Sequence, residues 1–354
     1  MNQVKDPEYP YQRQWRIPSV DIDRYQTLQE NWEASKNLII QIREALSRAE
    51  LHPDVYTVAA AGSIGRMEAS PEVSDADLII VLSDNVEELG LEEATKAYDS
   101  VWNALAELKI QKPKPTGVFA GATTQKELLD SVGDAQENYG VFGKRLLLLL
   151  ETQPLYKNEN YSGLMGIIVD RYAAGYVTED SKKEWTFLLN DLIRYFRAIA
   201  VNYQWSFDKE AEKWPLRNVK LRHSRIVMYS GLLFLLGQAS TERQDKVSWL
   251  KERLKMTPLE RLAWVYEENR EWNFHRIAGS YDVFLSLLNN EEVRQDLNVD
   301  PVEQQDDNSY KERYKIPEFA LLKSNSDGLI AELLRFIFAR RGVWTERFFE
   351  YLIF

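Results

Sequence analysis

The stretch from Ala59 to Leu82 (AAAGSIGRMEASPEVSDADLIIVL) constrains the fold of this 354-residue chain more than any other. It joins two short apolar runs, Val58–Ala61 and Leu78–Leu82. The second run is rich in β-branched residues and apolar throughout, as a buried strand should be. The first run ends at Gly62-Ser63, where glycine permits a tight turn and a close approach of the backbone to a ligand. We therefore expect two buried strands joined by a turn.

An acidic pair opens the second of these strands. Eleven residues lie between Ser63 and the tripeptide Asp75-Ala76-Asp77. Side chains two apart on a strand point to the same face, so the carboxylates of Asp75 and Asp77 should converge. Two close carboxylates repel each other unless a proton or a cation lies between them. Mg²⁺ prefers one or two carboxylates together with water and substrate phosphates, so this pair suits a metal–nucleotide site.

The residues that follow the turn complete this pattern. Residues 64–69 can begin a short helix, whose free N–H groups form a natural seat for phosphate. Taken singly, a Gly-Ser pair is usually a simple turn and an Asp-x-Asp is usually solvated. Their order and spacing between two apolar strands are far more specific, and they indicate a nucleotide site.

The stretch resembles the active-site motif of the DNA polymerase β-like nucleotidyltransferase superfamily: a hydrophobic residue, Gly-Ser, a spacer, then Asp-hydrophobic-Asp. The extended form, Gly62-Ser63-x-Gly65-Arg66-x-Glu68 leading to Ser74-Asp75-x-Asp77, looks closer to one bacterial branch. That branch includes the uridylyltransferases of PII signal proteins, the glutamine-synthetase adenylyltransferases, and nucleotidyltransferases often fused to cyclic-nucleotide-binding and CBS domains. Two further segments resemble the last group: Pro115–Ala120 resembles its third strand, and Arg145–Leu155 the helix and turn that follow.

This resemblance implies a site and a reaction. Asp75 and Asp77 would hold Mg²⁺ or Mn²⁺, while Gly62 and Ser63 would bind the triphosphate of an NTP. The enzyme would move a nucleoside monophosphate group from the NTP to an acceptor hydroxyl and release pyrophosphate. Such transfer depends mostly on positioning and on charge neutralisation, so two carboxylates can suffice if another group replaces the third.

Many active members supply a third carboxylate from a later strand, and this chain departs from that pattern. The corresponding strand would be Thr116–Thr124, which contains no acid. The nearest acids are Glu127 and Asp130, in the helix expected to follow. The alternative function is therefore a nucleotide-binding regulatory or interaction protein on the same fold, catalytically degenerate because the third carboxylate is missing.

Arg66 is a further candidate for nucleotide binding, and its position allows two interpretations. Its guanidinium either contacts a phosphate directly or forms an ion pair with Glu68 that braces the turn after Ser63. The sequence alone leaves both open.

A basic segment, Arg217–Arg225 (RNVKLRHSR), lies in the later part of the chain. Helical spacing places Arg217, Lys220 and Ser224 on one face. Related nucleotidyltransferases often set a basic residue of the following helical domain against the triphosphate, and Lys220 is the candidate here. The alternative is a solvated helix face paired with nearby acids. We interpret His223 as a structural or surface histidine rather than a catalytic base.

The rest of the chain indicates an α+β nucleotidyltransferase domain, with a small mixed sheet and flanking helices, followed by an α-helical domain. Apolar residues recur at helical spacing between Leu28 and Leu46, Gly117–Ala120 predicts a third strand, and long amphipathic helices follow residue 135. The predicted organisation is an N-terminal arm at 1–21, the nucleotidyltransferase domain at 22–135 and the helical C-terminal domain at 136–354.

Composition excludes several classes of function. Acids outnumber bases 55 to 44, giving a net charge of −11, which disfavours general nucleic-acid binding and favours a protein or small-molecule acceptor. The absence of cysteine excludes thiolate metal sites and a cysteine nucleophile, and three histidines are too few for a histidine-rich metal site. The longest apolar run, 226–237, falls short of the roughly 20 residues of a membrane span. We therefore expect no membrane partner and a cytoplasmic location.

Overall fold

A computed structural model describes most of the chain, and contacts between its residues divide it into two compact units. The described residues are 13–72, 75–85, 90–134, 136–174, 177, 185–205, 213–241, 245–298 and 315–353. The first unit, the sheet unit, comprises Met1–Arg16, Glu30–Phe187 and Arg243–Thr257. The second, the helical unit, comprises Ile17–Gln29, Leu188–Glu242 and Pro258–Phe354.

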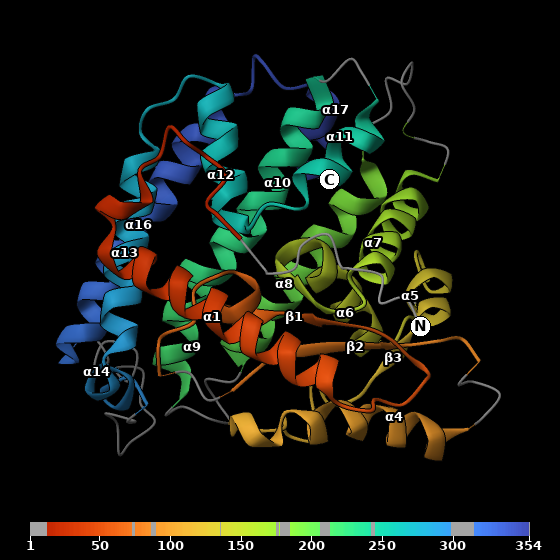
Figure 1. The fold of residues 1–354 in the computed structure, drawn as a ribbon. Coiled ribbons are helices and arrows are strands. Elements are labelled where there is room, and N and C mark those ends of the chain that lie inside the picture. The colour runs from red at the N-terminus through yellow and green to blue at the C-terminus, as the bar shows by residue number, and fades with distance from the viewer. Residues whose placement is uncertain are drawn as a thin grey trace. The chain divides into compact units, whose positions relative to one another are not determined.

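A four-stranded mixed sheet forms the centre of the sheet unit (Figure 1). Its strands are β1 (Val55–Ala60), β2 (Leu78–Leu82), β3 (Thr123–Thr124) and β4 (Gln153–Tyr156). Their spatial order is β3-β2-β1-β4. Strand β1 runs antiparallel to β2 and β4, whereas β2 and β3 are parallel. All five residues of β2 are buried, as its continuous apolar sequence predicts.

Helices surround this sheet. They are most of α1 (Gln26–Arg48), α2 (Gly62–Gly65), α4 (Leu91–Ala104), α5 (Gln125–Asp130), α6 (Tyr139–Glu151), α7 (Asn158–Ala173) and α11 (Lys246–Arg253). Helix α4 packs on β2, while α7 contacts β1 and β4. The helix predicted between Leu28 and Leu46 is α1, and Ile39, Ile42 and Leu46 on its apolar face are fully buried. Helical periodicity was therefore a reliable guide here.

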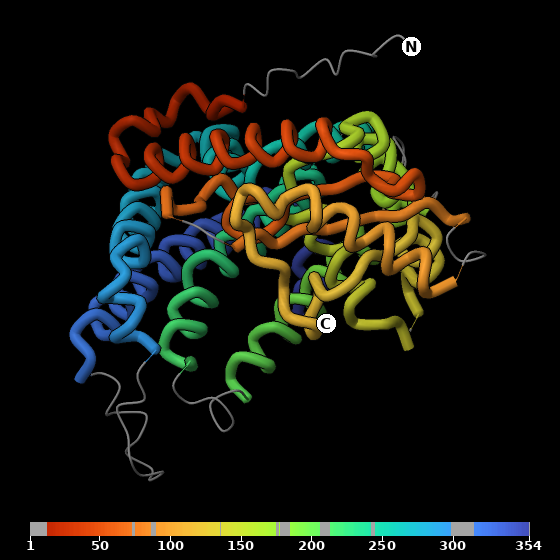
Figure 2. Tube along the Cα trace, turned by 60° about the horizontal axis from the view of Figure 1, so that its bottom comes forward, coloured from red at the N-terminus to blue at the C-terminus, as the bar shows by residue number. Residues whose placement is uncertain are grey.

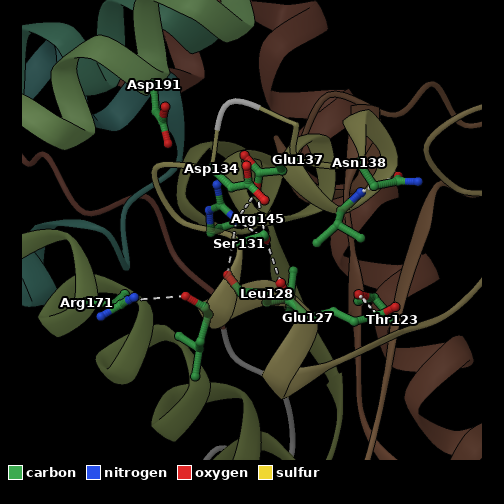
Figure 3. A network of polar contacts seen from close by, with 12 residues as sticks. Thr123, Glu127, Leu128, Ser131, Asp134, Glu137, Asn138, Arg145, Arg171 and Asp191 are labelled. Atoms are coloured by element: carbon green, nitrogen blue, oxygen red, sulfur yellow. Dashed lines mark hydrogen bonds and ion pairs between the residues drawn. The ribbon is translucent and has the colours of Figure 1, made fainter. Parts of the chain in front are cut away.

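Arg145 of α6 contacts residues of both α5 and α7, and Figure 3 shows it beside Leu128, Ser131 and Glu137. Its guanidinium is fully buried, forms an ion pair with Glu137, and donates hydrogen bonds to the Leu128 carbonyl (3.2 Å) and to the Ser131 hydroxyl (3.1 Å) at the end of α5. Its Nε also donates to the Tyr172 hydroxyl of α7 at 3.0 Å. A buried arginine with several acceptors around it fixes the relative placement of α5, α6 and α7.

The described elements of the helical unit are helices. They are α8 (Thr186–Trp205, mostly in this unit), α9 (Trp214–Lys220), α10 (Ile226–Thr241), α12 (Pro258–Glu268), α13 (Phe274–Asn289), α14 (Glu291–Asp296), α16 (Pro317–Ala339) and α17 (Glu346–Ile353), with a short 3₁₀ turn at Ile22–Arg24 and a π-helical segment at Leu221–Arg225. Helices α13 and α16 pack side by side (Figure 2).

An aromatic cluster fills the core of this unit. The ring of Phe336 lies 4.1 Å from that of Tyr266 and 5.0 Å from that of Phe234, and Trp344 packs edge-on against Phe234. Helix α10 can approach α12 closely because Gly231 has no Cβ. An added Cβ would lie only 2.7 Å from the Pro258 carbonyl oxygen.

The strands lie in the first part of the chain and helices follow them, so the prediction of a sheet-containing domain followed by helices is confirmed.

The predicted third strand was misplaced. Gly117–Ala120 lies in turns and bends, with Gly117 at a positive φ of 104°, and β3 occupies Thr123–Thr124 instead. Pro113 and Pro115 lack backbone N–H donors, and the glycine favours a turn, so the chain forms only an isolated bridge at Gln111 and pairs with β2 from Thr123.

The predicted boundaries at residues 21 and 135 differ from this division of the chain. Strand β4, at 153–156, completes the sheet after residue 135 by pairing with β1. Of the N-terminal arm, residues 1–12 lie outside the described part. Arg13 packs over the ring of Trp32 of α1, with 5.7 Å between its guanidinium carbon and the ring centroid. Among the described residues, no helix is both long enough and apolar enough to cross a membrane.

His223 is a buried part of the helical unit. Its ring stacks on Phe284 at 4.3 Å, its Nδ1 lies 2.9 Å from the Val219 carbonyl oxygen, and its Nε2 lies 3.1 Å from Nδ2 of Asn325. The Val219 carbonyl can only accept, so Nδ1 carries the proton, and the Asn325 amide donates to Nε2, which therefore carries none. These two partners fit the neutral imidazole ring. Burial lowers the pKa of His223 from 6.5 to about 4. The interpretation of His223 as structural rather than catalytic agrees with these contacts.

We predict that the folded protein loses stability in acid through His223. The unfolded chain binds the proton near pH 6.5 and the folded chain only near pH 4, so this contribution is fully present above the first pKa and is lost as pH falls towards the second. Between about pH 7.5 and about pH 5 the loss should be about 2 kcal/mol. Urea unfolding of wild type and His223→Gln at both pH values measures it. The variant should show a pH dependence weaker by that amount, and equal slopes would contradict the prediction.

Candidate functional site

The turn after β1 is shaped by the close approach of its first glycine to an acid. Gly62 has a positive φ of 62° and begins the four-residue helix α2. A Cβ placed there would collide with the carboxylate of Asp77. The absence of a side chain at Gly62 therefore brings the backbone of this turn directly against the acid.

A second glycine allows a second close approach. A Cβ at Gly65 would overlap the backbone carbonyl oxygen of Glu151 and would meet that of Ala60 at 2.7 Å. The Gly-x-x-Gly spacing thus has a steric cause at both ends: one glycine faces a carboxylate and the other faces two carbonyl groups. We call residues Gly62–Gly65 the glycine loop.

Ser63 lies within the glycine loop and is partly exposed. Its carbonyl oxygen accepts the N–H of Glu68 at 2.8 Å. Among the described residues no hydrogen-bond partner of its hydroxyl is present, so the hydroxyl can accept or donate to a ligand.

The acidic pair stands immediately before β2. Asp75 is exposed, Ala76 is buried and Asp77 is partly exposed, which is the alternation expected when both carboxylates face away from the core. The carbonyl oxygen of Asp77 accepts the N–H of Ala61 at 2.7 Å, which extends the antiparallel pairing of β1 and β2 to the turn. Register and sterics therefore place Asp77 at the glycine loop, and Asp75 lies two residues away on the same chain segment.

The donor set fits a hard cation held by few protein ligands. Among the described residues, no three acidic or histidine side chains gather closely enough to form a metal centre of their own. Two carboxylates with open positions for water and phosphate are what Mg²⁺ prefers. The acid nearest to the third strand has another role: Glu127 accepts the N–H of Thr124 at 2.8 Å and the Thr123 hydroxyl at 2.9 Å, and so caps α5.

Arg66 forms the ion pair with Glu68 that was one of the two interpretations of this residue. Its Nε lies 2.8 Å from Glu68 Oε2, and its Nη1 lies 2.6 Å from Glu151 Oε2. The arginine side chain is 7% exposed and the glutamate side chains are 4% and 0% exposed. These contacts show Arg66 paired with protein carboxylates. That Arg66 contacts a phosphate directly stays a prediction, and its ion pairs with Glu68 and Glu151 do not support it.

Glu151 is the residue of this site that sequence reasoning missed. It ends α6, directly after five leucines, and its carboxylate reaches both Arg66 and the backbone N–H of Gly62, the latter at 3.0 Å. Gln153, two residues on, donates from its amide to the Gly65 carbonyl at 3.2 Å. The available signal was a charged and an amide side chain directly after a wholly apolar run.

Lys220 is the last residue of α9 in the helical unit and is exposed. Of the three residues predicted to share a face, Lys220 is exposed and Arg217 is partly exposed, whereas Ser224 is buried. The π-helical segment Leu221–Arg225 makes a wider turn than an α-helix and so changes the phase after Lys220. The role of Lys220 in nucleotide binding stays a prediction.

Comparison with known proteins supports the same interpretation of this region. Residues 39–150 match the family model of the nucleotidyltransferase domain, and this match includes the glycine loop and the acidic pair. No curated protein and no solved structure matches the chain. The predicted fold class, a nucleotidyltransferase domain with a small mixed sheet followed by a helical region, is therefore confirmed. The closer relationship to PII uridylyltransferases and glutamine-synthetase adenylyltransferases stays a resemblance.

We predict that Gly65→Ala destabilises the protein by about 3 kcal/mol or more, because the added methyl group would overlap two backbone carbonyl groups that cannot rotate away. The control is Gly163→Ala, at an exposed position of α7 with open space around it, which should stabilise by up to about 1 kcal/mol. Free energies of unfolding in urea compare the two. Equal stability of both variants would refute the steric account of the glycine loop.

Proposed function

We propose that this protein is a Mg²⁺-dependent nucleotidyltransferase that moves a nucleoside monophosphate group from an NTP to an acceptor hydroxyl. The observation that carries the proposal is the close approach of the Asp77 carboxylate to Gly62 at the start of the glycine loop. A turn whose first residue has no side chain and a carboxylate packed against it are the two halves of a site for a metal-bound triphosphate. The nucleotidyltransferase domain assigned to residues 39–150 supports it.

In this proposal Asp75 and Asp77 hold Mg²⁺, or Mn²⁺ in its place, and Gly62 and Ser63 hold the triphosphate. The cation would neutralise charge on the phosphate oxygens. The protein's part is to fix the two carboxylates in one segment before β2 and to present the Ser63 hydroxyl and the loop backbone to the phosphates. Both tasks rest on the pairing of β1 with β2, which continues to Ala61 and Asp77 at the start of the loop.

The proposed reaction forms a bond between the acceptor oxygen and the α-phosphorus of the NTP. The bond from that phosphorus to the oxygen bridging to the β-phosphate breaks, and pyrophosphate leaves. The acceptor hydroxyl gives up its proton to solvent or to a base on the acceptor. Positioning and charge neutralisation account for most of the rate in transfers of this kind. A protein or small-molecule acceptor suits the net charge of −11 better than a nucleic acid does.

One observation favours a second candidate, a protein that binds a nucleotide without transferring it. The described residues hold no cluster of three potential metal ligands, and Glu127, the first acid after the third strand, caps a helix. Binding and transfer therefore need separate experiments.

We predict that one of ATP, GTP, CTP and UTP raises the melting temperature of the protein in the presence of Mg²⁺ and fails to do so without it. A ligand at about 100 times its Kd adds about 2.7 kcal/mol of stability. Asp75→Asn/Asp77→Asn should lose the shift. Asp170→Asn, which removes an exposed carboxylate of α7 that pairs with Lys251, should keep it. A shift retained in the double variant would refute the metal site.

Transfer is then tested with the NTP that binds, labelled on its α-phosphate, with Mg²⁺ and fractionated cell extract as the source of acceptor. Label should pass to an acceptor with wild-type protein and not with Asp77→Ala, because the metal that neutralises the phosphates is lost. Transfer by Asp77→Ala would rule out the proposed enzyme. Binding without transfer by the wild type would establish the second candidate.

A further inference from the structure

We propose that Glu151 positions the glycine loop for nucleotide binding, acting through Gly62 and Arg66 rather than on the substrate. The inference rests on the proposed function, because it concerns the geometry of the same nucleotide site. Glu151 ends α6 and comes from a part of the sequence 89 residues away from Gly62. Its carboxylate is nevertheless the group that contacts both the first residue of the loop and the residue just after it.

Each oxygen of this carboxylate has a different partner in the loop region. Oε1 accepts the backbone N–H of Gly62 at 3.0 Å, and Oε2 accepts Nη1 of Arg66 at 2.6 Å. The side chain is fully buried, so these contacts are made away from solvent, where hydrogen bonds to a charged group are strongest. One carboxylate group therefore holds the first residue of the loop and the residue that directly follows the loop.

The backbone around Glu151 supports the same segment. Its carbonyl oxygen lies against Gly65, where a Cβ would not fit, and the Gln153 amide donates to the Gly65 carbonyl. The junction of α6 and β4 thus contacts the loop at Gly62, Gly65 and Arg66. Because β4 pairs with β1, which leads into the loop, this junction is itself held by the sheet.

This arrangement affects the site through Gly62. Its N–H donates to Glu151, and the carboxylate of Asp77 occupies the space that a Cβ of residue 62 would need. A change in the direction of the Gly62 peptide would therefore move the loop relative to the proposed metal ligand. Ser63, the next residue, would move with it.

A carboxylate is needed for this role because both partners are donors. Glutamine at position 151 could accept from Gly62 or from Arg66 with its oxygen, but its NH₂ group would face the other donor. Glu151→Gln is close in size to the native residue and so removes the double acceptance with little change in volume. It leaves the ion pair of Arg66 with Glu68 in place.

Glu137 provides a matched control in the same unit. Its carboxylate is also buried, with 2% of its side chain exposed, and it also pairs with a buried arginine, Arg145 (Figure 3). This carboxylate accepts the Ser131 hydroxyl at the end of α5 and pairs with Arg145 of α6, whereas Glu151 contacts the glycine loop. Glu137→Gln therefore has a comparable effect on buried charge without touching the loop.

Two measurements on wild type, Glu151→Gln and Glu137→Gln test the inference, each at a temperature where all three proteins are folded. Hydrogen exchange followed by mass spectrometry reports on the amides of residues 61–68. We expect exchange there to be about tenfold faster in Glu151→Gln and unchanged in Glu137→Gln. Calorimetric titration with ATP, GTP, CTP and UTP, each with Mg²⁺, measures affinity. The Kd for the NTP that binds should rise about tenfold in Glu151→Gln alone.

The outcomes separate this inference from the proposed function. Unchanged exchange at residues 61–68 in Glu151→Gln overturns the positioning role, whether or not an NTP binds. Faster exchange with an unchanged Kd overturns it too, because the loop would then be held without effect on the site. Equal losses of affinity in Glu151→Gln and Glu137→Gln would reduce the effect to general destabilisation and would overturn it. Binding of no NTP by the wild type overturns the proposed function, and with it the role of Glu151 in nucleotide binding.

Discussion

The rest of the candidate site depends on the close packing of three chain segments around two glycines. The glycine loop, the acidic segment before β2 and the junction of α6 with β4 all meet where Gly62 and Gly65 carry no Cβ. A side chain at Gly62 would displace the Asp77 carboxylate, and one at Gly65 would push away the backbone at Glu151. The contacts of these glycines, rather than flexibility of the loop, explain why both positions lack a side chain.

Buried charge then stabilises one arrangement of that packing. Arg66 lies between the carboxylates of Glu68 and Glu151, and all three side chains are almost wholly buried. Removing charges from water is costly, so such a group is stable only when its geometry satisfies nearly every donor and acceptor. Asn31 of α1 adds to it by donating to the Glu68 carbonyl at 3.0 Å. An alternative position of the loop would leave a buried charge without its partner, which disfavours it strongly.

The sequence predicted those parts of the fold that local pattern determines. Strand Leu78–Leu82 and the helix around Ile39 follow from apolar runs of strand length and of helical period, and both were placed correctly. The third strand was misplaced because two paired residues are too short a strand to leave a pattern. Glu151 was missed because its partners lie 85 and 89 residues away. The burial of Ser224 was not predicted, because the π-helical segment in which it lies has no signature in residue spacing.

Charge also explains why the proposed function requires a cation. The protein carries a net charge of −11, and the Asp77 carboxylate lies against Gly62 of the loop that would receive a triphosphate, with Asp75 two residues away in the chain. Without a metal, these two carboxylates would repel the phosphates they are placed to meet. Arg66 does not offset this repulsion, because its guanidinium already pairs with Glu68 and Glu151. A divalent cation reverses the sign of the interaction, since it attracts the carboxylates and the phosphates alike. In the proposed function, an anionic nucleotide at this site therefore needs a cation on the two aspartates.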